Sequence, residues 1–220
     1  MAKRGFLELT SGIIRTGLLA SFLAALMFAI SPGVAQTSSA DMAKSLVAAA
    51  NARASVHVRY DGSYVRIVYP GGDVPSNTGA CTYEIIRIYR SVGIDLQKEV
   101  HEDIARNFSA YPTRRMWGRM SPDANIDHRR VPNLMTYFER QHASQPITQR
   151  AEDYLPGDVV AWDLGRGLTH IGMVVDGKAL LSGRHKVLHN IGNGPQIEDV
   201  LFDWKIIGHY RFYRVVVRTT

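Results

Sequence analysis

The sequence predicts an α+β domain in which N-terminal helices pack on a C-terminal antiparallel β-sheet. Two observations predict this class. Helical patterns fill the first half of the chain, and after residue 155 the apolar pattern changes to runs typical of strands. Removing an expected 35-residue signal peptide from the 220-residue chain leaves about 185 residues, enough for one domain with a core of its own.

The first 35 residues have the features of a secretory signal peptide. Lys3, Arg4 and Arg15 make the start basic, and the run over 16–30 is almost entirely apolar. Gly33-Val34-Ala35 then offers small residues to a signal peptidase. The apolar run has about 15 residues, fewer than the roughly 20 that span a bilayer, and an uncleaved anchor is the alternative. We expect an exported protein, periplasmic in a bacterium or otherwise secreted, with no stable membrane insertion after cleavage.

The charge of the chain indicates which classes of partner to expect. The chain has 26 Lys and Arg against 20 Asp and Glu, a formal net charge of +6, without a dense basic run that contains aromatic residues. Nucleic acid is therefore not an expected partner. The mild positive charge suits an anionic polymer such as the cell wall. We expect no cofactor, and the sequence leaves the oligomeric state open.

Helices are expected in the first half. A polar linker over 36–40 precedes a helix over 42–54, with Asp41 as its cap. Alternating residues predict a strand over 64–69, and Pro, Gly, Ser and Asn predict a loop over 70–79. Further helices are expected over 80–92, with Gly93 at the C-cap, over 98–108, and over 132–141, opened by Pro132. The stretch 109–130 is expected to be mostly irregular.

Strands are expected in the second half, over 158–163, 168–175, 186–191 and 205–217. Leu155-Pro156-Gly157-Asp158 predicts a turn into the first of them, and Asp176-Gly177 predicts a hairpin turn. Residues 41–220 are thus expected to form one domain.

Cys81 is the only cysteine, so no intrachain disulfide can form. In an exported protein an unpaired cysteine indicates a reactive thiol or an intermolecular bond, and the alternative is a small buried hydrophobe. Cys81 lies in the first turn of an expected helix, where free backbone N–H groups and the helix dipole favour a thiolate. Ile85, Ile88 and Val92 share its helical face, which places the thiol at the end of a buried seam. The N–H of Cys81 is a ready oxyanion donor.

His170 is the candidate base. It interrupts an apolar strand, where a lone histidine is usually a core or edge residue. However, Gly172 shares its face and removes bulk where another backbone can approach, and the helix of Cys81 is expected there.

His189 follows the expected hairpin and is placed to orient the ring of His170 from a neighbouring strand. Asn190 and His185 are the alternatives for this role. Nucleophile, base and orienting group together are the logic of an activated cysteine.

Several motifs follow one another along the chain: Tyr69 with Gly71-Gly72, Cys81, Leu155-Pro156-Gly157-Asp158, His170-Ile171-Gly172-Met173, and His189 on the next strand. This order resembles the NlpC-type cell-wall peptidases, papain-like enzymes that cut peptidoglycan stem peptides. The resemblance implies a papain-like fold, with Cys81 as nucleophile, His170 as base and His189 as the third polar residue. It also implies that Tyr69 helps to shape the oxyanion site.

Longer strings extend over nearly the whole mature chain: Gly79-Ala80-Cys81-Thr82, Tyr89-Arg90, Gly93-Ile94-Asp95-Leu96-Gln97, His101-Glu102-Asp103, residues 125–134, and His189-Asn190-Ile191-Gly192. They resemble domain of unknown function family 1287, which the resemblance places in the same superfamily. Two positions depart from the patterns. Ala80 stands where NlpC-type enzymes usually have Asp, and Tyr83 stands where the closer family usually has Asp. These departures bear on substrate preference and helix capping.

Asp127-His128-Arg129-Arg130 is a dense polar cluster in an expected loop. Its arginines are suited to forked contacts with carboxylates of a stem peptide, so we expect the cluster to line the cleft. The alternative is a solvated loop with internal ion pairs.

Three rival functions remain open. His and Asp residues are numerous enough for a metal site, although no spacing matches a zinc signature and the single cysteine argues against a structural zinc, so no metal is expected. The same fold can serve as a binding module for cell-wall peptides without cutting them. The same Cys–His pair can also transfer an acyl group instead of hydrolysing it.

Overall fold

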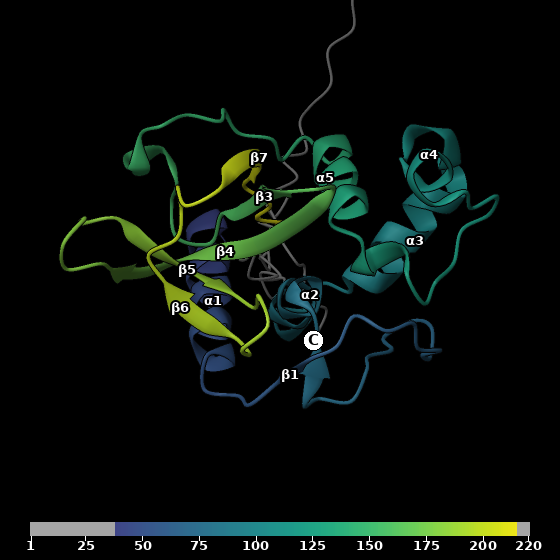
Figure 1. The fold of residues 1–220 in the computed structure, drawn as a ribbon, viewed down its shortest axis with the longest axis horizontal. Helices are drawn as coiled ribbons and strands as arrows, with labels where there is room; N and C mark the ends of the chain where they lie inside the picture. The colour runs from purple at the N-terminus through teal and green to yellow at the C-terminus, as the bar shows by residue number, and fades with distance from the viewer. Residues whose placement is uncertain (1–37, 215–220) are drawn as a thin grey trace, which may run out of the picture. The chain divides into compact units, whose positions relative to one another are not determined.

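Residues 38–214 are described by a computed structural model of the protein. Within them, five α-helices accompany an antiparallel five-stranded sheet, which confirms the α+β class (Figure 1). The signal peptide expected over 1–35 lies outside the described residues. The helices are α1 Ser39–Arg53, α2 Cys81–Ser91, α3 Leu96–Arg106, α4 Thr113–Trp117 and α5 Val131–Arg140. The strands of the sheet are β3 Val159–Gly165, β4 Leu168–Lys178, β5 His185–His189, β6 Gln196–Glu198 and β7 Lys205–Tyr210.

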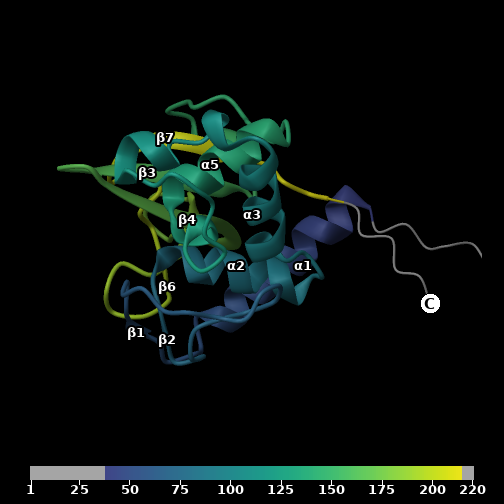
Figure 2. The ribbon, with the colours of Figure 1, turned by 90° about the vertical axis from the view of Figure 1, so that its right-hand side faces the viewer.

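The sheet has the order β6-β5-β4-β3-β7, and every pair of neighbours is antiparallel. Its central strand, β4, is the one that carries His170. Two short strands, β1 Arg59–Tyr60 and β2 Thr78–Gly79, form a separate parallel pair. Because β2 leads directly into α2, this pair lies at the N-terminal end of that helix (Figure 2). Three short 3-10 turns complete the chain: η1 Phe108–Ala110, η2 Asp127–Arg129 and η3 Ala151–Asp153.

The two faces of the sheet are buried against different partners. Successive side chains of a strand point to opposite faces. Ile171 and Met173 of β4 join the larger apolar cluster, which contains Leu46 of α1 and Ile85 of α2. Full burial of side chains of this size stabilises the fold by roughly 1.5–3 kcal/mol each. Val174 instead joins a smaller cluster on the other face, with Trp162 and Val187.

Local signals determine where the helices begin and end. At the end of α2, Gly93 has a positive φ of 89°, and its N–H donates to the carbonyl of Arg90, which confirms the expected glycine cap. At the start of α1 the expectation is wrong by a few residues. Ser38 is the cap and accepts from the N–H of Asp41, so the helix begins at Ser39, inside the linker expected over 36–40.

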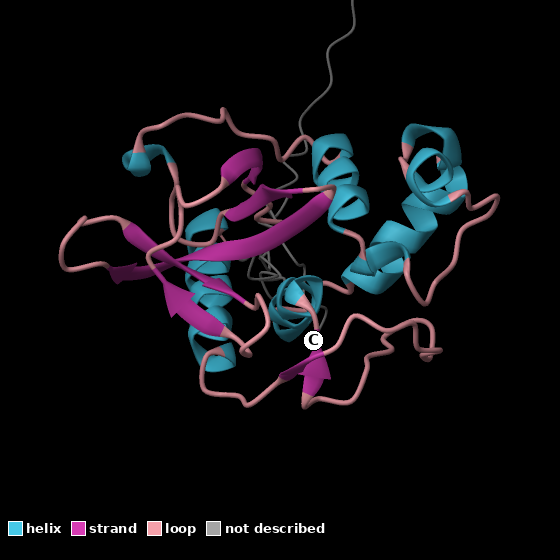
Figure 3. Cartoon of the chain, in the orientation of Figure 1, coloured by secondary structure: helices cyan, strands magenta, loops and turns pink. Residues whose placement is uncertain are grey.

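The strand expected over 64–69 does not form, and this stretch is loop (Figure 3). Side chains from distant segments satisfy its backbone in place of a partner strand. The Ile67 N–H donates to Asn125 Oδ1 at 2.9 Å, and Gln97 Nε2 donates to the Val68 carbonyl at 2.9 Å. Alternating hydrophobicity therefore indicated which residues are partly buried, Val65 and Ile67, but it did not indicate which groups satisfy the backbone.

Two details of the sheet also differ from expectation. Asp176-Gly177 is part of β4, because pairing with β5 continues to Lys178 opposite His185, and the hairpin turn lies at 179–184. There the Ala179 N–H donates to the Arg184 carbonyl at 2.9 Å. The last strand ends at Tyr210, so 211–214 are not strand and 215–217 lie outside the described residues.

Candidate active site

Cys81 is the first residue of α2 and lies against the open edge of β4. β5 pairs with β4 only from Gly172 onward, so β4 runs past the end of β5 at Ile171. The Val174 N–H points to the β3 side, where it donates to the Asp158 carbonyl at 2.8 Å, so the Ile171 N–H, three residues away, points to the opposite edge. That N–H and the N–H groups of Thr82 and Cys81 face the sulfur. The thiol therefore sits beside the residue that follows His170.

The thiol is 6% exposed, and this burial decides its protonation. Burial raises the pKa of Cys81 to about 11, and the surrounding N–H groups lower it only in part. We expected the helix N-terminus to favour the thiolate. That expectation is wrong for this closed arrangement, because the cost of desolvating the sulfur outweighs the N–H dipoles.

His170, His189 and Glu198 form a hydrogen-bonded chain. His170 Nε2 lies 2.9 Å from His189 Nδ1, and His189 Nε2 lies 2.8 Å from Glu198 Oε2. A carboxylate can only accept, so His189 holds its proton on Nε2 and accepts on Nδ1 from His170 Nε2–H. His170 is thereby left with an unprotonated Nδ1. Burial, and next the neighbouring His189, lower the pKa of His170 to about 3, so the ring is neutral at pH 7.

The ring of His170 stands on the face of β4 that is turned away from the helices. It stacks on Trp162 with ring centroids 5.7 Å apart, and Trp204 meets it edge-on at 5.8 Å. Cys81 belongs to the larger cluster on the helix side. The hydrogen bonds described for the two histidine rings run to each other and to Glu198, and none of them reaches the Cys81 sulfur. The direct Cys81–His170 pair therefore stays a prediction.

Gly172 does leave room for a second backbone, but that backbone is β5. A Cβ on Gly172 would lie 2.8 Å from the Leu188 carbonyl and 2.8 Å from Val187 Cγ1. The helix of Cys81, which we expected at this position, lies instead at the open edge beside Ile171.

Tyr69, the expected oxyanion residue, has its contacts on α3. It is half-exposed, contacts Glu102 through its hydroxyl, and meets His101 with ring centroids 5.0 Å apart. Tyr60 is the tyrosine that interacts electrostatically with Cys81, because burial, and next the charge of a Cys81 thiolate, raise the pKa of Tyr60. Tyr60 belongs to β1, which is paired with β2 in front of α2.

The cluster at 127–130 is built on a 3-10 turn over 127–129 in which Asp127 and His128 are buried and Arg129 is partly exposed, so it is not a solvated loop. Asp127 Oδ2 lies 2.8 Å from His101 Nδ1. His128 is fully buried with neither ring nitrogen hydrogen-bonded, and burial, then Arg129 and Arg90, lower its pKa to about 3. Arg130 stacks over Trp117 at 3.9 Å. Arg129 and His128 reach the first turn of α2, where the Arg129 carbonyl accepts from Thr82 Oγ1 at 3.1 Å and the ring of His128 meets Tyr83.

Sequence reasoning missed Glu198, Tyr60 and the two tryptophans. Glu198 is on the three-residue strand β6, and its pairing opposite Val187 is what brings it to His189. A strand this short has no periodicity to detect, and Arg59–Tyr60 is shorter still. Trp162 lies on an expected strand, one residue before its end, but the register that places it opposite His170 is set by the pairing of β3 with β4.

A cavity of the structure lies away from the expected site residues. A cavity of about 830 Å³ is lined by residues of η1, α4 and α5 and includes none of the expected site residues. Within residues 38–214, no three His, Cys, Asp or Glu side chains are grouped to hold a metal ion. None of the helices described there is both long and apolar enough to cross a bilayer.

Comparison with known proteins shows the family. The family described as Domain of unknown function (DUF1287) matches residues 47–212. The chain is 53% identical over 154 residues to the uncharacterized protein YijF of Escherichia coli (strain K12), an alignment that covers 70% of this chain and 74% of that relative. No solved structure matches. Cys81, His170, His189 and Glu198 all lie inside the matched region, and the chain belongs to the DUF1287 family.

Proposed function

We propose that this protein is an exported, papain-like cysteine hydrolase that cleaves amide bonds in peptidoglycan stem peptides. One observation carries the proposal. The His170–His189–Glu198 chain leaves an unprotonated Nδ1 on His170, the residue next to the backbone N–H that faces the sole cysteine. A nucleophile at a helix N-terminus, a base, and two groups that orient the base are the parts that acyl transfer needs.

The proposed reaction begins with the substrate carbonyl beside Cys81. For the first step the ring of His170 has to turn from the face on which it stacks on Trp162 to the edge of β4 where Cys81 lies. Its Nδ1 then takes the thiol proton as the sulfur bonds to the carbonyl carbon. The Cys81 N–H donates to the resulting oxyanion, and the hydroxyl of Tyr60 takes the part that the resemblance assigned to Tyr69. The C–N bond then breaks as His170 returns the proton to the leaving amine. Water, deprotonated by His170, cleaves the thioester and releases the acid and the free thiol.

Glu198 and His189 have a positioning role in this scheme. His189 fixes the tautomer of His170, and the Glu198 carboxylate stabilises the positive charge that the two rings share after proton transfer. Glu198 is exposed, with a side-chain exposure of 45%, so its carboxylate reaches His189 without the cost of full burial.

The test is digestion of isolated sacculi, with the released fragments identified by mass spectrometry. The chain without residues 1–35 is expected to release fragments whose masses identify the cleaved bond, and Cys81→Ala is expected to release none. His170→Asn is expected to lose at least 100-fold in rate. His189→Asn is compared with His185→Asn, a histidine at the far end of the same strand that should tolerate the change. Any hydrolysis that persists in Cys81→Ala refutes the mechanism.

A non-catalytic binding module is the second candidate, and the buried thiol favours it. With a pKa of about 11, Cys81 is almost entirely protonated at pH 7 in this arrangement. If neither the wild type nor Cys81→Ala releases fragments but both sediment with sacculi, the protein binds cell wall without cutting it.

A further inference from the structure

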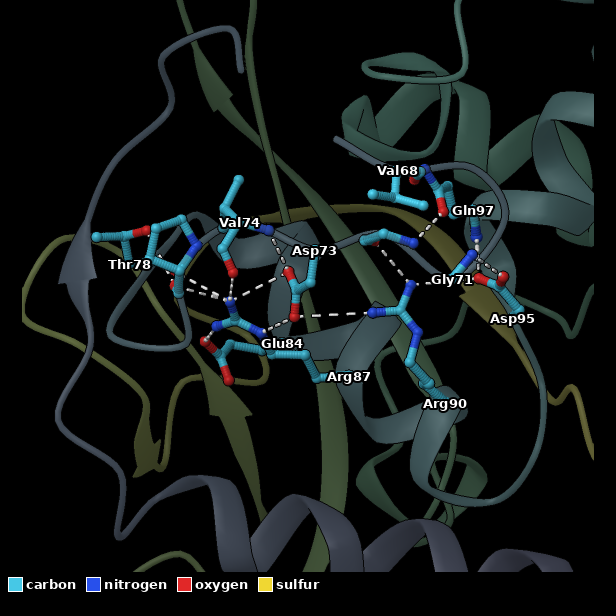
Figure 4. A network of polar contacts seen from close by, with 12 residues as sticks. Val68, Gly71, Asp73, Val74, Thr78, Glu84, Arg87, Arg90, Asp95 and Gln97 are labelled. Atoms are coloured by element: carbon cyan, nitrogen blue, oxygen red, sulfur yellow. Dashed lines mark hydrogen bonds and ion pairs between the residues drawn. The ribbon is translucent and has the colours of Figure 1, made fainter. Parts of the chain in front are cut away.

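Arg129 differs from the other arginines near α2 because it has no acidic partner. Arg87 pairs with Asp73 at 2.8 Å, and Arg90 pairs with Asp95 at 3.3 Å (Figure 4). Arg53 pairs with Glu84 at 2.7 Å. Within residues 38–214 the guanidinium of Arg129 forms no ion pair and no hydrogen bond, and its Nε and Nη1 are buried.

Burying guanidinium nitrogens without an acceptor costs free energy of folding, so another interaction is expected to stabilise Arg129. Its one described compensation is the ring of Tyr83, which lies 5.0 Å from the guanidinium carbon. Tyr83 is 1% exposed, and its hydroxyl is buried without a hydrogen-bond partner among the described residues. The Arg129 guanidinium and the Tyr83 hydroxyl are thus two hydrogen-bond donors that lie together, and neither has an acceptor among the described residues.

Neighbouring groups do not supply the missing acceptor. The ring of His128 meets Tyr83 edge-on at 6.3 Å, but both of its nitrogens also lack partners. Arg130 is compensated differently, because it stacks on Trp117 and has Asp127 and Asp123 as charged neighbours. Arg87, Arg90 and Arg130 also have one buried nitrogen each without a hydrogen-bond partner, but each of them has an acidic neighbour, which Arg129 lacks among the described residues.

These donors adjoin the first turn of α2. Tyr83 is the second residue after Cys81, and the Arg129 backbone is held to Thr82 by the hydrogen bond at 3.1 Å. Arg129 is partly exposed as a residue, and its Nη2 is not among the enclosed nitrogens, so solutes can reach the guanidinium from that side. A planar ligand with two oxygens matches the guanidinium edge.

We propose that Arg129 and Tyr83 form a carboxylate-binding subsite at the first turn of α2, the turn that begins with Cys81, and that this subsite selects substrates with a free carboxylate near the scissile amide. The side chains of Cys81 and Tyr83 leave the helix on different faces, so a substrate reaches both by lying across the N-terminal end of α2. This inference rests on the proposed function where it calls the ligand a substrate. Binding of a carboxylate at the subsite does not itself require hydrolysis. It narrows the substrate class from amides in general to acidic peptides. In a stem peptide the carboxylate would come from a chain end or from the side of an acidic residue.

The first test uses the single cysteine of the full chain as its reporter. N-iodoacetylglycine and N-iodoacetylglycinamide have the same length and differ in the carboxylate, and both alkylate thiols. Their rates of Cys81 labelling are measured by intact-protein mass spectrometry. The ratio of the acid rate to the amide rate should fall about tenfold in Arg129→Ala and several-fold in Tyr83→Phe, because charge-assisted hydrogen bonds are lost. Arg115→Ala removes an exposed, unpaired arginine on α4 and should leave the ratio unchanged.

A second measurement does not depend on thiol reactivity. N-acetylglycine at constant ionic strength should raise the Tm of the wild type, and N-acetylglycinamide should not. Arg129→Ala should abolish this difference, whereas Arg115→Ala should keep it. An unchanged labelling ratio, or an equal Tm shift in Arg129→Ala and wild type, overturns the subsite.

The two proposals can fail separately. Sacculus digestion that depends on Cys81, together with no preference for the acid reagents, refutes the subsite and leaves the hydrolase. A preference for the acid reagents that depends on Arg129, without any digestion, refutes the hydrolase and leaves a carboxylate-binding module.

Discussion

Titration of Cys81 tests whether burial in the closed site raises the pKa of the thiol. The structure places the pKa at about 11, because the sulfur is buried against β4 beside Ile171. An unperturbed thiol has a pKa of about 8.5. At pH 8 the thiolate fraction is therefore on the order of 0.1% in the closed protein and roughly a quarter for a free thiol, a difference of about 200-fold.

The assay is ¹³C NMR of protein labelled at cysteine Cβ, which shows one signal because Cys81 is the only cysteine. The chemical shift is followed from pH 6 to 11.5. Tyr60→Ala is the informative variant, because Tyr60 interacts electrostatically with a Cys81 thiolate; if its ring shields the sulfur, its removal should lower the pKa of Cys81 by about one unit or more as water enters. A wild-type pKa below 7 would refute the reasoning from burial and would indicate a thiolate–imidazolium pair with His170.

Two further predictions concern stability. His128 and His170 each have a pKa lowered to about 3, so the unfolded chain takes up protons near pH 6.5 while the folded protein does not. Their contribution to the free energy of unfolding is complete above pH 6.5 and is lost as the pH falls towards 3, by about 2 kcal/mol per histidine at pH 5. Urea unfolding of His128→Gln at several pH values should show about half of this loss. An unchanged dependence of the unfolding free energy on pH would contradict the prediction. Asp158 is fully buried and accepts from His209, Arg211 and Tyr213, and although burial raises its pKa, these hydrogen bonds hold it below the usual value. Asp158→Asn should cost about 3–5 kcal/mol of unfolding free energy at pH 7, whereas Asp163→Asn near the end of β3 should cost under about 1 kcal/mol; similar losses for both would contradict the pairing.

Much of the framework was predictable because its signals are local. Gly93 ends α2 through its own positive φ, and Pro132 lies in the first turn of α5. Cys81 at the start of α2 follows from the change from a Gly-rich loop to a helical apolar face, which neighbouring residues determine. The same local reasoning identified β4 as the strand that carries His170.

The site was only partly predictable because its partners are distant in sequence. Nothing near Glu198 indicates that β6 will bring it to His189, and nothing near Tyr60 indicates that a two-residue strand will pair it with Gly79, two residues before Cys81. The resemblance to NlpC-type peptidases assigned Tyr69 to the oxyanion site, but the loop that carries Tyr69 is held by Gln97, and its hydroxyl contacts Glu102 of α3.

The sequence by itself determined the α+β class, the single thiol at a helix N-terminus, and which residues of β4 share a face. Only the tertiary structure decided which face the helices cover, that the thiol meets β4 at an open edge, and that Arg129 is left without an acid. The physical reason is that periodicity records which side chains are alike in exposure within one element. The partner of each face, and the burial that sets the protonation of Cys81 and His170, depend on the packing of elements far apart in the chain.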